Sequence, residues 1–156
     1  GVVMLYAGER SVAYENFYQR WRHLFEGNPD QVRALGLITD HQKLADYYAM
    51  CDVFALPSRT DMFPSVQIEA LLCGTPVVAT DIPGAREVVK VTGMGLLVEP
   101  RNPRALAEGL VRVLEARASY LKPYAEIRQV FSTEKTIAQY ESLLLNMAGP
   151  HVARPA

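Results

Sequence analysis

Two carboxylates and a helix-start signal stand close together in the middle of the chain. Pro64 and Ser65 suit the start of a helix, and the free N–H groups at such a start bind anions such as phosphate. Asp61 precedes this start, and Glu69 falls in the second turn of the helix that follows. Ionised carboxylates accept hydrogen bonds, and sugar hydroxyls donate them. The combination indicates a site for a diphosphate joined to sugars, as in a nucleotide sugar.

The same two carboxylates have a second interpretation that needs no ligand. Acidic side chains before a helix and in its first turns interact favourably with the helix dipole. Asp61 and Glu69 alone do not separate this structural role from a binding role. Both interpretations stay open until more of the chain is considered.

Short apolar runs alternate with segments of helical periodicity along the chain, which predicts strands connected by helices. The expected strands are Val2–Ala7, Val32–Ile38, Asp52–Leu56, Pro76–Thr80 and Gly95–Val98. The expected helices are Ser11–Glu26, Asp40–Met50, Ser65–Cys73, Gly84–Val91, Asn102–Leu114, Tyr120–Val130 and Thr133–Met147. Continuous apolar strands of this kind are typical of a parallel sheet. We expect an α/β, Rossmann-like, doubly wound and mostly parallel sheet of about five strands, with helices on both faces.

This fold class also predicts where a ligand binds. In open parallel sheets the ligand lies at the carboxyl ends of the strands, where loops turn into helices. The loop that carries Asp61 leaves the carboxyl end of the strand Asp52–Leu56. The two carboxylates therefore fall at the expected place.

The composition is that of an ordinary globular domain. The chain has 156 residues, of which 49% are hydrophobic and 21% charged, and its net charge is −1. We expect one domain over residues 1–147 and a flexible tail over residues 148–156. A balanced charge offers no general attraction to nucleic acid, so we expect no nucleic-acid partner. Arg10 follows the first strand and could approach phosphate, but a solvated loop arginine is the favoured interpretation.

Neither the cysteines nor the apolar segments indicate export or membrane insertion. Cys51 and Cys73 stand in apolar surroundings, which favours small buried side chains over a disulfide. No apolar run approaches the roughly 20 residues that span a bilayer, and the first residues lack a signal-peptide pattern. We expect a cytoplasmic protein, with peripheral membrane attachment of a full-length enzyme left open.

A longer pattern surrounds the two carboxylates. The segment Pro57–Val89 is PSRTDMFPSVQIEALLCGTPVVATDIPGAREVV. It closely resembles the C-terminal domain signature of glycosyltransferase family 4, the group 1 retaining enzymes of GT-B fold. That signature has Pro-Ser, an acidic residue, seven intervening residues, Glu-Ala, and Gly-x-Pro-Val-Val-Ala. The matching residues here are Pro57, Ser58, Asp61, Glu69, Ala70 and the run Gly74–Ala79. The resemblance extends over about Val2 to Leu114.

The resemblance implies a donor site for a UDP- or GDP-linked sugar, with no cofactor and no required metal. Glu69 would bind the ribose hydroxyls, and Asp61 would bind hydroxyls of the transferred sugar. Both would position the donor for transfer with retained anomeric configuration, so neither is assigned as a general base. Amides near Ser65 and Val66 would meet the diphosphate, and Leu37 and Ile38 would pack on the nucleobase. The donor-binding residues would thus be Phe63, Pro64, Ser65, Val66, Leu37 and Ile38.

The sequence departs from the family pattern in two ways. Asp61 stands where the family usually has Glu, and its side chain is one methylene shorter. By the resemblance, the segment Val2–Ala7 corresponds to the second strand of the family's domain, so we expect this chain to lack the first strand, with its Arg and Lys for the diphosphate. We likewise expect it to lack the acceptor-binding N-terminal domain. We therefore expect an isolated chain that is inactive and exposed strand edges that could support a homodimer.

Two other functions stay as alternatives. One is another GT-B enzyme, such as a nucleotide-sugar epimerase or a phosphorylase. An epimerase would need further carboxylates and a histidine in the crevice, which the sequence does not indicate. The other is a non-catalytic Rossmann-like module for interaction or oligomerisation, which the missing strand favours.

Overall fold

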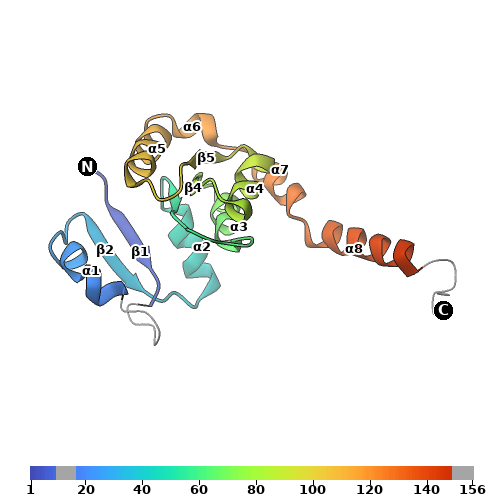
Figure 1. Ribbon diagram of the computed structural model, residues 1–156, viewed down its shortest axis with the longest axis horizontal. Helices are drawn as coiled ribbons and strands as arrows, with labels where there is room; N and C mark the ends of the chain where they lie inside the picture. The colour runs from blue at the N-terminus through green and yellow to red at the C-terminus, as the bar shows by residue number, and fades with distance from the viewer. Residues whose placement is uncertain (10–16, 149–156) are drawn as a thin grey trace. The chain divides into compact units, whose positions relative to one another are not determined.

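The computed structural model describes residues 1–9 and 17–148 and divides into two compact units, Gly1–Tyr47 and Tyr48–Ala156 (Figure 1). Each predicted strand is present, and every strand pairing is parallel. The parallel α/β fold is confirmed, with hydrogen bonds joining the strands into one sheet of two strands and one of three. Arg10, the predicted helix start at Ser11 and the tail from Gly149 lie outside the described residues.

The first unit is a β-α-β element. Strand β1 (Met4–Ala7) pairs with β2 (Val32–Gly36), and helix α1 (Phe17–Glu26) lies between them in sequence. The Tyr6 ring of β1 meets the Phe25 ring of α1 edge-on, with centroids 5.6 Å apart. Strand β2 ends at Gly36, before the predicted Ile38, because Gly36 has a φ of +77° and leaves the extended conformation.

Helix α2 (His41–Ala49) begins where the sequence predicts. The Asp40 side chain accepts a hydrogen bond from the Lys43 N–H at 2.9 Å, which caps the first turn. Near the other end, the Tyr47 hydroxyl donates to the Leu5 carbonyl at 3.2 Å. This bond ties α2 to β1 within the first unit.

In the described residues, the second unit contains the strand order β3-β4-β5 and six connecting and following helices. Its elements are β3 (Phe54–Leu56), α3 (Ser65–Leu72), β4 (Val77–Thr80), α4 (Pro83–Thr92), β5 (Gly95–Val98), α5 (Pro103–Glu115), α6 (Arg117–Tyr120), α7 (Tyr124–Val130) and α8 (Thr133–Ala148). Because parallel crossovers are right-handed and the order is sequential, α3 and α4 lie on the same face of the sheet. Helix α5 packs on the other face through Val113, which clusters with Val78 and Val98.

Strand β4 is the centre of this unit. All four residues of Val77–Thr80 are buried, and successive side chains point to opposite faces, so both faces of the sheet are covered. Helix α5 comes very close, since a Cβ at Gly109 would stand 2.7 Å from a Val98 methyl group. The predicted helices on both faces are therefore found here.

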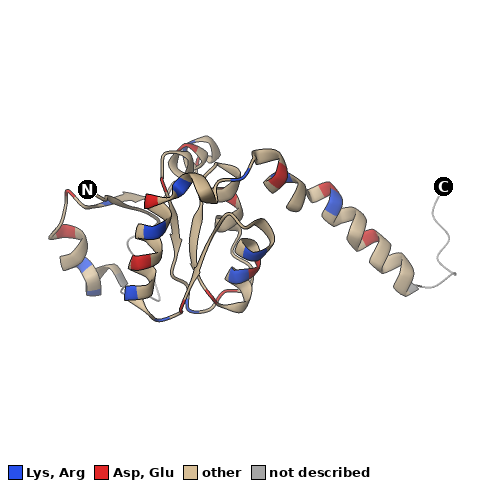
Figure 2. Ribbon diagram, turned by 90° about the horizontal axis from the view of Figure 1, so that it is seen from above, with Lys and Arg blue, Asp and Glu red and all other residues tan. Residues whose placement is uncertain are grey.

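The C-terminal helices differ in how they are held. The predicted helix Tyr120–Val130 is divided, because Leu121 is extended and α7 begins after Pro123. Ile127 anchors α7 with 1% of its surface exposed, whereas the side chains of α8 up to Met147 are exposed. Among the described helices, none is both long enough and apolar enough to cross a membrane. Basic and acidic residues are interspersed along the ribbon (Figure 2).

Candidate functional site

The loop with Asp61 lies where the fold class places a ligand. It leaves the carboxyl end of β3 at Leu56 and enters α3 at Ser65. Pro64 is buried and extended at the N-cap, and it has no side-chain acceptor that could cap the first turn. The first-turn amides of Ser65 and Val66 are therefore the groups that an anion would meet.

The Glu69 carboxylate is held from two sides. The Tyr48 hydroxyl donates to Glu69 Oε2 at 3.1 Å, and the Ser65 hydroxyl donates to Glu69 Oε1 at 3.3 Å. Glu69 itself is half-buried in the second turn of α3. Its carboxylate is thus kept close to the helix start from which the amides of Ser65 and Val66 emerge.

Asp61 is held by its backbone and not by its side chain. Within residues 1–9 and 17–148, its half-buried carboxylate takes part in no hydrogen bond or ion pair. A Cβ at Gly84, in the first turn of α4, would overlap the carbonyl oxygens of Asp61 and Met62. The absence of a side chain at Gly84 therefore lets this loop pack directly on α4. Met62 and Phe63 remain exposed beside Asp61.

Two hydrogen bonds connect this loop and its helix to the buried core. The hydroxyl of Thr80, at the end of β4, donates to the Ser58 carbonyl at 2.6 Å. The fully buried Gln67 of α3 donates through Nε2 to the Ala85 carbonyl of α4 at 3.1 Å. The position of the Asp61 loop is consequently set by β4 and α4, elements that follow it in sequence.

The predicted site residues divide between the two units. Asp61, Glu69 and the residues Phe63, Pro64, Ser65 and Val66 all lie around the start of α3 in the second unit. Leu37 and Ile38 belong to the first unit, directly after β2, and Leu37 is 60% exposed. The sequence did not indicate the bond from Tyr48 to Glu69. Only spatial proximity reveals that bond, since 21 residues separate the two.

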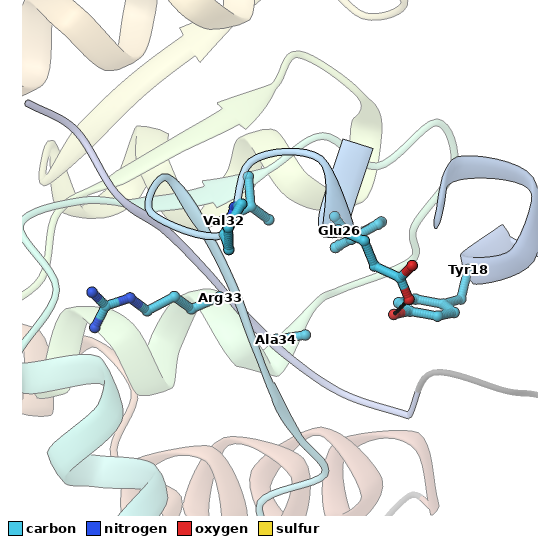
Figure 3. A pocket seen from close by; sticks show the side chains of 7 residues that line it. Tyr18, Glu26, Val32, Arg33 and Ala34 are labelled. Carbon is cyan, nitrogen blue, oxygen red and sulfur yellow. Dashed lines mark hydrogen bonds between the residues drawn. The ribbon is translucent and has the colours of Figure 1, made fainter. Parts of the chain in front are cut away.

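A hollow of about 470 Å³ lies in the first unit between α1 and β2 (Figure 3). It is lined by Tyr18, Phe25, Glu26, Pro29, Val32, Arg33 and Ala34. The Glu26 carboxylate accepts hydrogen bonds from Tyr18 at 3.3 Å and from Arg22 at 2.7 Å. The hollow adjoins Val32, at the amino end of β2, whereas parallel sheets bind ligands at the carboxyl ends. It is therefore the weaker candidate.

In the part of the chain that the structure describes, no three His, Cys, Asp or Glu side chains gather in a metal-binding arrangement. The prediction that the reaction requires no metal is not tested by this observation.

A parallel α/β fold with an uncapped helix start at the carboxyl end of a strand has the architecture in which nucleotides commonly bind. Residues 11–130 match the family described as Glycosyl transferases group 1. The chain therefore belongs to the group 1 glycosyltransferases.

The chain is similar to part of longer proteins. D-inositol 3-phosphate glycosyltransferase 1 of Catenulispora acidiphila is 33% identical over 111 residues, which cover 67% of this chain and 27% of that protein. The chain thus spans about a quarter of that relative's length.

Solved structures agree on the fold. Sucrose-phosphate synthase of Thermosynechococcus elongatus has a TM-score of 0.73 at 29% identity, covering 91% of this chain and 37% of that one. Anabaena HepE in complex with UDP has a TM-score of 0.72 at 27% identity, covering 90% and 41%. The HepE complex with UDP-glucose has a TM-score of 0.72 at 25% identity, with the same coverage.

Proposed function

We propose that this chain is the donor-binding domain of a retaining glycosyltransferase, which transfers a sugar from a UDP- or GDP-linked donor to an acceptor. The observation that carries the proposal is the Glu69 carboxylate, held by Tyr48 and Ser65 at the start of α3. Family membership and the UDP and UDP-glucose complexes of HepE support it.

Each site residue has a role in this proposal. Glu69 accepts hydrogen bonds from the ribose hydroxyls, and the amides of Ser65 and Val66 bind the diphosphate. Asp61 accepts hydrogen bonds from the transferred sugar, which suits a carboxylate that is not committed to another described residue. Leu37 and Ile38 contact the nucleobase.

In the chemistry that follows, the bond from the anomeric carbon to the diphosphate oxygen breaks and the acceptor oxygen bonds that carbon on the same face. The proton of the acceptor hydroxyl passes to the leaving diphosphate oxygen. Negative charge develops on the leaving diphosphate oxygen, and the partial positive charge at the start of α3 stabilises it. Asp61 and Glu69 position the donor and do not move a proton, and no metal is assigned to the step.

We also propose that this chain by itself binds a donor but does not transfer sugar, since it matches only 27% of the length of a glycosyltransferase relative.

Thermal unfolding with added nucleotide tests the donor site. UDP or GDP at about a hundredfold excess over its dissociation constant stabilises by about 2.7 kcal/mol, which raises the melting temperature by roughly 5–10 °C. Glu69→Ala removes the shift. The control Glu108→Ala, in an exposed ion pair with Arg104, keeps it. No shift with either nucleotide at millimolar concentration contradicts the proposal.

A second experiment separates the sugar contact from the nucleotide contact. Calorimetry should show that Asp61→Ala weakens the binding of UDP-glucose and leaves the binding of UDP almost unchanged, because only the transferred sugar contacts Asp61. Asp61→Glu restores the longer side chain of the family and should strengthen UDP-glucose about threefold to tenfold, the effect of one hydrogen bond. Equal changes for both ligands would remove Asp61 from the sugar site.

The alternative of an interaction module has one supporting observation. Val2, Val3 and Met4 are exposed at the start of β1, next to a strand with an unpaired edge. Such edges pair with other chains, so a homodimer formed through them is the expected assembly. Light scattering should give a dimer that Val3→Lys converts to a monomer. A monomer before the substitution contradicts this assembly and leaves the donor site untouched.

A further inference from the structure

Tyr48 connects the donor site to the core of the second unit. Its hydroxyl bonds Glu69 Oε2 at 3.1 Å, and its ring is 5% exposed and meets Phe54 of β3 edge-on, with centroids 5.6 Å apart. Its backbone carbonyl accepts hydrogen bonds from the Thr75 hydroxyl at 2.6 Å and from the Cys51 amide at 3.0 Å. The hydroxyl is therefore presented by a residue whose ring and backbone are both held.

The second donor to Glu69 is different in kind. Ser65 is exposed and lies one turn before Glu69 on the same helix. Its bond is local and moves with α3, so it does not relate the carboxylate to the rest of the fold. Tyr48 comes from α2, and its bond sets the Glu69 side chain against a separate element.

The two bonds also determine what Glu69 can still accept. A carboxylate offers about four acceptor positions on two oxygens. With Tyr48 on Oε2 and Ser65 on Oε1, each oxygen keeps one position for a ligand. Two acceptors on neighbouring oxygens match two hydroxyls on neighbouring carbons, as in a ribose 2′,3′-diol.

We propose that Tyr48 is a positioning residue, whose hydroxyl keeps Glu69 in the orientation that accepts both hydroxyls of the nucleotide's ribose. The inference rests on the proposed function. A long, half-buried glutamate would otherwise lose rotamer freedom on binding, and the Tyr48 bond removes that freedom in advance. Tyr48 does not touch the reacting atoms.

The test is the ability of the chain to distinguish UDP from 2′,3′-dideoxy-UDP, measured by calorimetry (or the guanosine pair, if GDP is the nucleotide that binds). Tyr48→Phe keeps the ring against Phe54 and removes only the hydroxyl. It should reduce the preference for the ribose form about fivefold to tenfold and leave the affinity for the dideoxy form unchanged. In a Glu69→Gln background, Tyr48→Phe should have little further effect, because the two residues act as a pair.

The neighbouring tyrosine supplies the control. Tyr47 is also buried, and its hydroxyl donates to the Leu5 carbonyl at 3.2 Å and not to Glu69. Tyr47→Phe should lower the melting temperature and leave the ribose preference unchanged. If Tyr48→Phe behaves in the same way, Tyr48 is only structural and the proposal is overturned.

Two further results complete the test. If the unsubstituted chain binds neither nucleotide, the proposed function fails, which is a different result from a failure of Tyr48 alone. Should Tyr48→Phe not fold, NMR of the unsubstituted chain replaces it. Bound UDP should slow the exchange of the Tyr48 hydroxyl proton with water, and exchange that UDP leaves unchanged overturns the proposal.

Discussion

Strand β4 of the second unit and strand β2 of the first unit are both short, and each pairs in parallel within its own sheet. The two strands differ in how far their side chains are buried. All four residues of β4 are buried, whereas β2 alternates between half-buried and exposed residues. The loop with Asp61 takes its support from β4 and α4, through Thr80 and Gly84. The residues of the candidate donor site thus depend on the better-packed unit. Leu37 and Ile38 follow the less covered strand β2.

The largest expected effect compares one leucine in each unit. Leu71 in α3 is 1% exposed, and Leu35 in β2 is 46% exposed. Leu71→Ala should cost about 2–5 kcal/mol of unfolding free energy, since it removes buried methyl groups and leaves a cavity. Leu35→Ala should cost less than about 1 kcal/mol. Urea unfolding measures both, and similar losses would show that the units are equally well packed.

Substitution of two glycines distinguishes a general loss of stability by overpacking from a specific loss of UDP binding. Gly84→Ala and Gly109→Ala each introduce a Cβ into occupied space, at the Asp61 loop and at Val98 respectively. Each should cost about 1–3 kcal/mol. Only Gly84→Ala should also weaken the binding of UDP in calorimetry, because only the Cβ at position 84 displaces the loop that carries Asp61. Equal UDP affinities in the two variants would mean that the loop position is unimportant for binding.

A smaller effect concerns the hydrogen bond that holds the start of this loop. Thr80→Val keeps the shape of a buried side chain and removes its donor to the half-buried Ser58 carbonyl, which should cost about 0.5–1.5 kcal/mol. Thr136→Val removes a comparable bond to the Ser132 carbonyl on the exposed helix α8 and should cost less than about 0.5 kcal/mol. Thermal unfolding of the pair checks this difference between buried and exposed bonds.

The smallest effect is on reactivity. Burial, and secondarily the nearby Asp52 carboxylate, raise the pKa of the Cys51 thiol, so less thiolate is present at neutral pH. In a Cys73→Ser background, the pH midpoint of alkylation should lie above about 8.5, the value of free cysteine. The Cys51 thiol stays protonated to a higher pH in the folded state than in the unfolded state. Its contribution to the free energy of unfolding is therefore fully present below the pKa of the unfolded thiol, about 8.5, and is lost as the pH rises through the folded pKa. A midpoint at or below 8.5 would place Cys51 in a more exposed setting.

Several local features could be predicted because their causes are local. The helices expected from Asp40 and from Asn102 are present, because each of these residues caps the first turn through its side chain, Asp40 on α2 and Asn102 on α5. The start of α3 at Ser65 follows from Pro64, which cannot continue a hydrogen-bond ladder. The division of the predicted helix Tyr120–Val130 was missed, since Leu121 and Pro123 interrupt a periodic apolar pattern without changing it.

The class of fold could be predicted from the chain alone, because hydrophobic periodicity is a property of neighbouring residues. The resemblance to a known family and the stretch of the candidate site were likewise visible in the local motif from Pro57 to Val89. What holds that stretch in place depends on contacts that exist only in the folded chain. Tyr48 reaches Glu69 from another helix, and Gly84 meets the Asp61 loop from a following one. Such contacts join residues far apart in the chain. No local pattern encodes the direction in which a hydroxyl donates or the space that a missing Cβ leaves.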